Sequence, residues 1–123
     1  MAGRERLIGA SEQIAERGKG LRFTVDTPDG GWLPAFAIRY KGVVYAYVNR
    51  CAHVSVELDW AEGDFFDISG LYLVCATHGA AYIPNSGKCA MGPCKGGALQ
   101  PLPTSEHGGN IYLIEQEDAT DEW

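Results

Sequence analysis

Apolar and polar residues alternate along several short stretches of the chain, which is the pattern of half-buried β-strands. Residues 21–26 show this alternation first, with three apolar side chains separated by three polar ones. Two longer strands are predicted over 32–40 and 43–49, because the Lys41-Gly42 pair between them suits a tight hairpin turn. The residues of the second strand that we expect to face the core are Val44, Ala46 and Val48.

Two further strands are predicted over 71–74 and 111–115, each preceded by a turn sequence that contains glycine. The only helix-like stretch near the start is 11–17, where Ser11 is a suitable N-terminal cap and Gly18 ends the helix within two turns. Sixteen glycines and six prolines agree with short strands that are joined by many tight turns. The pattern therefore predicts an all-β protein.

Length and composition limit what such a protein can be. A chain of 123 residues, 46% hydrophobic and 21% charged, suits one ordered domain with a modest core. Its net charge of −6 argues against nucleic acid as a partner, because phosphate groups bind to basic surfaces. No apolar run is long enough for a membrane span, and charged residues stand where a signal peptide would be apolar. We therefore expect a cytoplasmic protein.

Two pairs of cysteine and histidine carry the strongest chemical signal in the sequence. Cys51 and His53 are separated by one residue and Cys75 and His78 by two, with residues 54–74 between the two motifs. Each pair directly follows a strand-like apolar run, so that a rigid sheet can present both motifs to one point. Together they offer two thiolates and two imidazoles, which are suitable ligands for a small inorganic centre.

Three alternatives to such a shared inorganic centre have to be weighed. The four residues can be unrelated, but two short-range pairs bounded by strands and glycines argue against coincidence. A structural Cys₂His₂ zinc site is chemically reasonable, although zinc sites usually pair cysteine with cysteine and histidine with histidine. A cysteine nucleophile with a histidine base does not explain why the pair occurs twice.

In order and spacing, the two pairs resemble the Rieske iron–sulfur family, in which two cysteines bind one iron of a [2Fe–2S] cluster and two histidines bind the other. The resemblance extends over about 21–115. It implies one cluster for this chain. It also implies that Cys51 and Cys75 hold the inner iron, and that His53 and His78 hold the outer iron.

The resemblance also gives roles to positions around the ligands. Gly79 would let the chain turn close to the cluster, and Tyr82 places a hydroxyl where it can bond a cysteine sulfur. Gly92-Pro93 matches the loop that covers the cluster in the family. The implied fold is a Rieske-like antiparallel β sandwich or barrel base with an inserted cluster-binding subdomain. Its parts are base strands at about 21–50 and 96–115, a cluster-binding region at about 51–95, and an acidic C-terminal tail at 116–123.

The implied ligand set bears on the reduction potential. With two thiolates and two neutral imidazoles, the oxidised cluster has no net charge and accepts an electron more readily than a four-thiolate cluster. Respiratory Rieske proteins have disulfide-forming cysteines where this chain has Val56 and Thr77, and a serine hydroxyl on a bridging sulfide where it has Ala80. Because a lost donor disfavours the more negative reduced state, we expect a potential well below the respiratory class.

The segment between the pairs allows two interpretations. It contains five acidic residues and no lysine or arginine. It is either a solvated hairpin whose aromatic residues pack inward, or an acidic rim that steers a basic partner toward the cluster. The acidic residues are Glu57, Asp59, Glu62, Asp64 and Asp67, and the aromatic ones considered are Trp60, Phe65 and Phe66.

The other two cysteines, Cys89 and Cys94, are five positions apart in the sequence. Such a short loop closes a disulfide if the two Cα atoms approach within about 7 Å. The alternative is two reduced thiols that pack beside the cluster. The sequence leaves both open.

The leading interpretation is a soluble one-electron carrier of the Rieske ferredoxin type, monomeric or weakly oligomeric. It would accept electrons from a reductase and pass them to a terminal oxygenase or a similar acceptor. It is not itself expected to be an enzyme, because a ring-hydroxylating oxygenase needs a further domain with a mononuclear iron site. The alternatives are a small non-catalytic subunit of a larger redox enzyme, like that of assimilatory nitrite reductase, and a zinc-stabilised interaction module.

Overall fold

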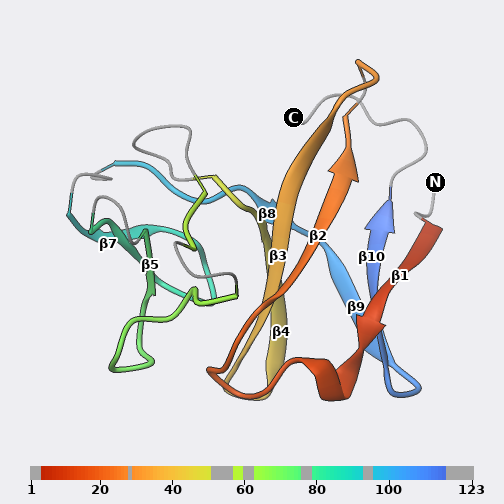
Figure 1. Cartoon of the computed structure of the whole chain (residues 1–123), viewed down its shortest axis with the longest axis horizontal. Coiled ribbons are helices and arrows are strands. Elements are labelled where there is room, and N and C mark those ends of the chain that lie inside the picture. Colours follow the sequence, from red (N-terminus) through yellow and green to blue (C-terminus); the bar gives the residue numbers. More distant parts are fainter. Residues whose placement is uncertain are drawn as a thin grey trace.

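The computed structural model describes residues 4–27, 29–50, 57–59, 63–75, 79–92 and 96–115. Within these ranges, ten strands form three antiparallel sheets, which confirms the all-β prediction (Figure 1). The strands are β1 (Arg4–Ala10), β2 (Leu21–Asp26), β3 (Trp32–Tyr40), β4 (Val43–Val48), β5 (Leu73–Val74), β6 (Ala81–Tyr82), β7 (Cys89–Met91), β8 (Pro101–Leu102), β9 (Thr104–His107) and β10 (Asn110–Glu115).

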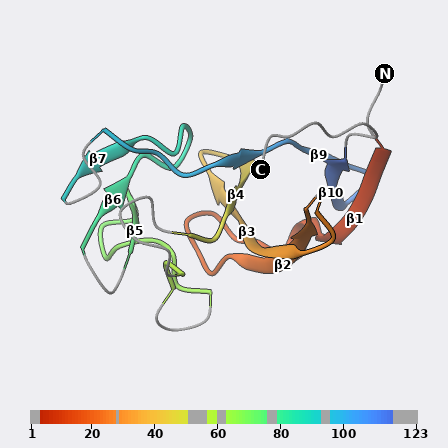
Figure 2. The same ribbon diagram turned by 90° about the horizontal axis from the view of Figure 1, so that it is seen from above.

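The three sheets divide the molecule into a base and a smaller end region. The base contains a four-stranded sheet in the order β2-β3-β4-β8 and a three-stranded sheet in the order β1-β10-β9. The third sheet, β5-β6-β7, lies at the opposite end of the molecule from β1 and β10 in both views (Figures 1 and 2). The residues that carry the second Cys–His pair follow β5, so the candidate site belongs to this end region.

Strand β3 is buried on both faces, which explains why the site can be built against the base. Ala35 and Ala37 point into a core between the two base sheets, and Phe36 and Ile38 point into a second core on the other face. The alternation continues in β4, where Val44, Ala46 and Val48 face the first core, as predicted. The second core contains Cys75, so the same sheet supports both regions.

The hairpin between β3 and β4 has the turn that the sequence predicts. Lys41 and Gly42 both have positive φ, 53° and 81°, as the central residues of a type I′ turn require. This backbone twist matches the right-handed twist of the two strands. It fixes a pairing in which Tyr40 lies opposite Val43.

The predicted helix over 11–17 is wrong beyond its first turn. A 3₁₀ turn spans Ser11–Gln13, and the chain then becomes extended at Ile14. Contacts with the β3–β4 hairpin replace further helical bonds: Arg39 Nε donates to the Ile14 carbonyl, and the Glu16 carboxylate accepts from the backbone of the hairpin turn. Tertiary contacts therefore override the local helical preference.

Arg39 also joins the two base sheets. Its guanidinium donates to both carboxylate oxygens of Glu106 in β9, at 2.7 and 3.1 Å. This hydrogen bonding lowers the pKa of Glu106 below its ordinary value.

No helix in the described part of the chain is long and apolar enough to cross a membrane.

Candidate metal centre

The second Cys–His pair begins on a turn that the backbone closes. Cys75 directly follows β5 and is fully buried. Its N–H donates to the Ala80 carbonyl at 2.8 Å, and its carbonyl accepts from the Gly79 N–H at 2.7 Å. We call residues 76–79 the second ligand loop; His78 within it lies outside the described residues. Both ends of this loop are therefore fixed to each other without any side chain.

The surroundings of Cys75 are apolar and continuous with the core of the end region. Cys75, Ala80 and Tyr82 all belong to this core, and none of them is exposed to solvent. Tyr82 lies opposite Leu73 in the neighbouring strand, and Leu73 is two positions before Cys75 in the sequence. A thiolate in such a setting needs a cation to compensate its charge, so this donor fits a metal centre.

The chain just before Pro93 packs against the second ligand loop. Gly92 has a φ of +92°, and a Cβ at this position would lie 2.9 Å from the Gly79 carbonyl oxygen and 3.0 Å from the Ala80 Cα. Only glycine allows this close approach of two backbones. Gly79 also has positive φ but faces open space. Pro93 itself lies outside the described residues, so its role as a covering residue stays a prediction.

The first Cys–His pair, Cys51 and His53, lies in a part of the chain that the structure does not describe. The structure does describe the residues on either side of this pair, 49–50 and 57–59. Asn49 follows β4 and is 1% exposed, and its Oδ1 accepts from the Leu58 N–H at 2.9 Å. The two ends of residues 50–57, which we call the first ligand loop, are therefore held together by one buried amide.

Side chains from the base, Lys19 and Arg22, contact the acidic segment. Phe65 packs inward as the hairpin interpretation expects, stacked on Phe36 with ring centroids 3.9 Å apart. The four acidic residues that the structure describes all have partners within the molecule. A hydrogen bond to an amide or a backbone N–H leaves a carboxylate charged, so these contacts do not decide between the solvated hairpin and the steering rim. The contacts are Glu57 with Arg22, Asp59 with Asn49, Asp64 with Lys19, and Asp67 with the backbone of Gly70.

Sequence reasoning missed Asn49 and Asp59, which lie before and after the first Cys–His pair in the sequence and bond each other. Both are buried, although the sequence pattern groups Asp59 with four other acidic residues of one segment. The available signal was the polar Asn49 directly after an apolar strand and just before the first Cys–His pair, because asparagine often closes loops through its side chain.

A buried tyrosine fixes the β6–β7 region to the base. Tyr47 in β4 donates its hydroxyl hydrogen to the Pro84 carbonyl at 2.7 Å, and burial raises the pKa of Tyr47. Gly87 passes so close that a Cβ there would lie 2.7 Å from the Tyr47 ring. Cys89 in β7 is disulfide-bonded, which decides between the two interpretations of this cysteine; its partner is not among the described residues.

Comparison with known families and sequences gives one match. The model of the Rieske [2Fe-2S] domain matches residues 7–105. This range includes both Cys–His pairs, Tyr82 and the Gly92-Pro93 pair. No curated protein sequence matches the chain.

Solved structures with the same fold include small ferredoxins. The chain is similar to the ferredoxin of carbazole 1,9a-dioxygenase from Nocardioides aromaticivorans IC177, with 19% identity and a TM-score of 0.69 over 91% of this chain and 98% of that one. It is also similar to the Sphingomonas yanoikuyae B1 ferredoxin, with 16% identity and a TM-score of 0.70 over 92% of this chain and 100% of that one. A chain in the complex of reduced oxygenase and oxidized ferredoxin in carbazole 1,9a-dioxygenase matches at 19% and 0.68, over 92% and 95%.

Proposed function

Since this chain belongs to the Rieske [2Fe-2S] domain family, we propose that it is an electron-transfer protein that carries one electron from a reductase to a terminal oxygenase. The observation that carries this proposal is the fully buried Cys75, on a backbone-closed loop against which Gly92 packs. The shared fold with the ferredoxin of an oxygenase system supports the same role. We do not expect the chain to catalyse a reaction itself.

The ligands in this proposal are Cys51 and Cys75 for one iron and His53 and His78 for the other. Complete burial of Cys75 supports its place at the inner iron. When bound, the cluster supplies a centre that gains and loses one electron. The chain holds that centre and shields its inner end from water, with Tyr82 and Ala80 in the surrounding apolar core. The histidine edge is the route by which an electron reaches a partner.

The proposal includes a low potential within the Rieske range of roughly −150 to +300 mV. Ala80 lies buried beside Cys75 and has no hydroxyl to donate to a sulfide. Val56 and Thr77, which replace the disulfide cysteines of respiratory proteins, lie outside the described residues. A redox titration should therefore give a midpoint well below the respiratory class.

We further propose a cytoplasmic protein that works as a monomer or a weak oligomer. The complex of an oxygenase with a ferredoxin of this fold supports a terminal oxygenase as one kind of partner. We also propose that residues 51–95 form the cluster-binding region, between base strands at 21–50 and 96–115; the acidic tail at 116–123 lies outside the described residues. Cell fractionation and sedimentation of the purified protein test the location and the oligomeric state.

The deciding experiment is EPR spectroscopy of the dithionite-reduced protein, together with iron and acid-labile sulfide analysis. We expect a red-brown protein with two irons and two sulfides per chain and a Rieske-type signal. Cys75→Ser should abolish the signal, because it removes a buried ligand. Cys89→Ser is the matched control: it changes a cysteine of the same region that is already disulfide-bonded, so it should keep the signal.

A colourless protein that holds zinc and no sulfide would contradict the proposal and favour a structural metal site. Retention of the full signal by Cys75→Ser would contradict the ligand set.

A further inference from the structure

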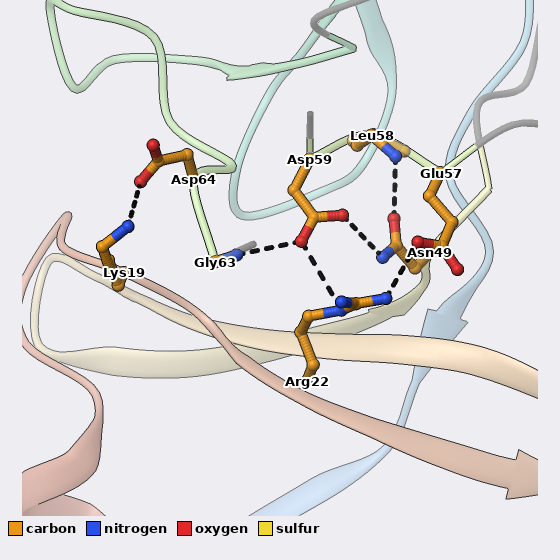
Figure 3. A network of polar contacts seen from close by, with 8 residues as sticks. All are labelled: Lys19, Arg22, Asn49, Glu57, Leu58, Asp59, Gly63 and Asp64. Atoms are coloured by element: carbon orange, nitrogen blue, oxygen red, sulfur yellow. Dashed lines mark hydrogen bonds and ion pairs between the residues drawn. The ribbon is translucent and has the colours of Figure 1, made fainter. Parts of the chain in front are cut away.

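A chain of buried hydrogen bonds joins the base sheet to the segment after the first ligand loop (Figure 3). Asn49 Oδ1 accepts from the Leu58 N–H at 2.9 Å, and Asn49 Nδ2 donates to Asp59 Oδ1 at 3.1 Å. The backbone N–H of Asn49 donates to the Pro34 carbonyl at 2.8 Å, which fixes Asn49 to β3. Asn49 therefore connects Leu58 directly to the base sheet.

Asp59 extends this chain to two more partners. Its Oδ2 accepts from the Gly63 N–H at 2.9 Å and lies 3.5 Å from Arg22 Nε in β2. The Asp59 side chain is completely buried, whereas the Arg22 side chain is one-third exposed. Arg22 also bonds Glu57 at 2.8 Å, so one cation holds both acids that flank Leu58.

The polarity of these bonds admits only one arrangement of donors and acceptors. The Leu58 N–H can only donate, so the Asn49 amide must present its oxygen there and its NH₂ group to Asp59. Asp59 must then accept from Asn49 on one oxygen and from Gly63 on the other. An amide in place of the Asp59 carboxylate has only one oxygen, and would leave one of these buried donors without an acceptor.

We propose that Asn49 and Asp59 are positioning residues for the metal centre, because they fix both ends of the first ligand loop and thereby the place of Cys51 and His53. Asn49 lies two positions before Cys51, and Leu58 lies five positions after His53. Loss of this closure returns conformational freedom to the loop and weakens its grip on an inner and an outer ligand. The proposal rests on the proposed function, in which Cys51 and His53 bind the cluster.

Three variants test the chain of bonds in the cluster-loaded protein. Asp59→Asn and Asn49→Asp each leave mismatched partners at nearly unchanged volume. The double variant Asn49→Asp/Asp59→Asn restores the hydrogen bonds to Leu58 and Gly63 and the one between residues 49 and 59, because the new carboxylate accepts from Leu58 and from the new amide, which accepts from Gly63. Arg22 loses its ion pair with residue 59 in this variant and keeps the one with Glu57. Net charge in the double variant equals that of the original chain.

Asp64→Asn is the matched control for charge and location. It removes one negative charge from the same segment, but Asp64 is exposed and pairs only with exposed Lys19 among the contacts in Figure 3. An electrostatic effect of the segment as a whole would appear in Asp64→Asn and Asp59→Asn alike. A positioning effect appears only in Asp59→Asn.

The measurements are the rate of cluster loss under a chelator, followed by visible absorbance, and the EPR spectrum of the reduced protein. We expect the two single variants to lose the cluster about tenfold faster or more, with a changed or broadened signal. The double variant and Asp64→Asn should behave like the original chain. If a single variant fails to fold, the double variant still decides, because it must fold and hold a cluster normally.

Normal retention and spectra in both single variants would overturn the inference, as would failure of the double variant to recover or equal effects of Asp64→Asn. A lower unfolding temperature in the single variants with an unchanged signal and loss rate would show a purely structural role, and would overturn it too. These results leave the proposed function intact. Absence of a Rieske signal in the original chain contradicts the proposed function, and this inference falls with it.

Discussion

The two ligand loops are closed at their bases in different ways. Backbone groups of Cys75, Gly79 and Ala80 close the second loop, whereas the Asn49 side chain closes the first. Gly92 also packs against the end of the second loop, at Gly79 and Ala80, so closely that a Cβ at this position has no room. The first loop is anchored by Asp59 and its contact with Arg22 instead.

This difference shows which substitutions each loop can tolerate. A loop closed by backbone bonds depends on φ, ψ and close approach, so an added methyl group damages it and a change of polarity does not. A loop closed by buried side chains depends on matched donors and acceptors, so isosteric polar substitutions damage it. The same cofactor would then be held by two regions that fail for different physical reasons.

The largest effect is expected where both loops share support. Phe65→Ala removes a fully buried ring that stacks on Phe36 in the core that also contains Cys75. The free energy of unfolding should fall by about 3–5 kcal/mol, measured by urea denaturation, and both loops should lose their support together. The control is Phe66→Ala, because Phe66 is only half-buried and should cost clearly less. Equal losses of unfolding free energy in the two variants would contradict the role of Phe65 as the buried residue that supports both loops.

Gly92→Ala should damage the second loop selectively. The new Cβ would meet backbone atoms of Gly79 and Ala80 at 2.9 and 3.0 Å, and the backbone cannot yield as a flexible side chain does. We expect the purified variant to lose most of its iron and sulfide, measured by chemical analysis.

Gly96→Ala separates this clash from conformational strain. Gly96 has a similar positive φ, +84°, but open space around its Cβ position. The Gly96→Ala variant should therefore be less stable by about 1–2 kcal/mol, the cost of a non-glycine residue in a left-handed conformation. It should keep its cluster. Equal cluster loss in both variants would mean that close packing on the second loop is not the cause.

The smallest effect should come from a change in the base, away from both loops. Glu106→Gln weakens the contact with Arg39 and should cost about 1–2 kcal/mol, with an unchanged EPR signal. Because hydrogen bonding from Arg39 lowers the pKa of Glu106, this contribution is present above the ordinary pKa of 4.5 and is lost as pH falls through the lowered value. Urea unfolding of both proteins between neutral and acidic pH measures the difference.

Glu12→Gln provides the control, since it makes the same charge change at an exposed residue of the 3₁₀ turn. A cost for Glu106→Gln that persists unchanged in acid would contradict the assignment to the Arg39 contact.

Alternation and turn residues made the base strands predictable from the sequence. Residues 21–26 alternate, 43–48 form a continuous apolar run after the Lys41-Gly42 turn, and the structure places strands at both. Strand β1 was not predicted, because three of its first residues, Arg4, Glu5 and Arg6, are charged and give no apolar period. It forms because β10 offers a long antiparallel partner. Strands of two residues, such as β6 and β8, are too short to show any period.

The candidate site divides in the same way. The Cys–His spacing led to the family, which the match over 7–105 confirms. The positive φ of Gly79 agrees with the turn that its sequence position suggested. Burial of Asp59 could not be predicted, because it depends on contacts with Arg22 in β2 and with Asn49 after β4. Only the folded sheet, in which β3 lies between these two strands, brings both residues to Asp59. The breaking of the predicted 11–17 helix by Arg39 has the same origin.

The pairing of β1 with β10 has a practical consequence for engineering. Arg4 lies opposite Glu115 in this ladder, so the entry and exit of the described chain are adjacent (Figure 1). Both strands are at the far side of the molecule from β5, which leads into the second ligand loop (Figure 2). Adjacent ends favour splicing of one domain into a surface turn of another. This domain is therefore suited to insertion into a host protein, or to attachment to an electrode, with β5 and the second ligand loop facing away from the attachment point.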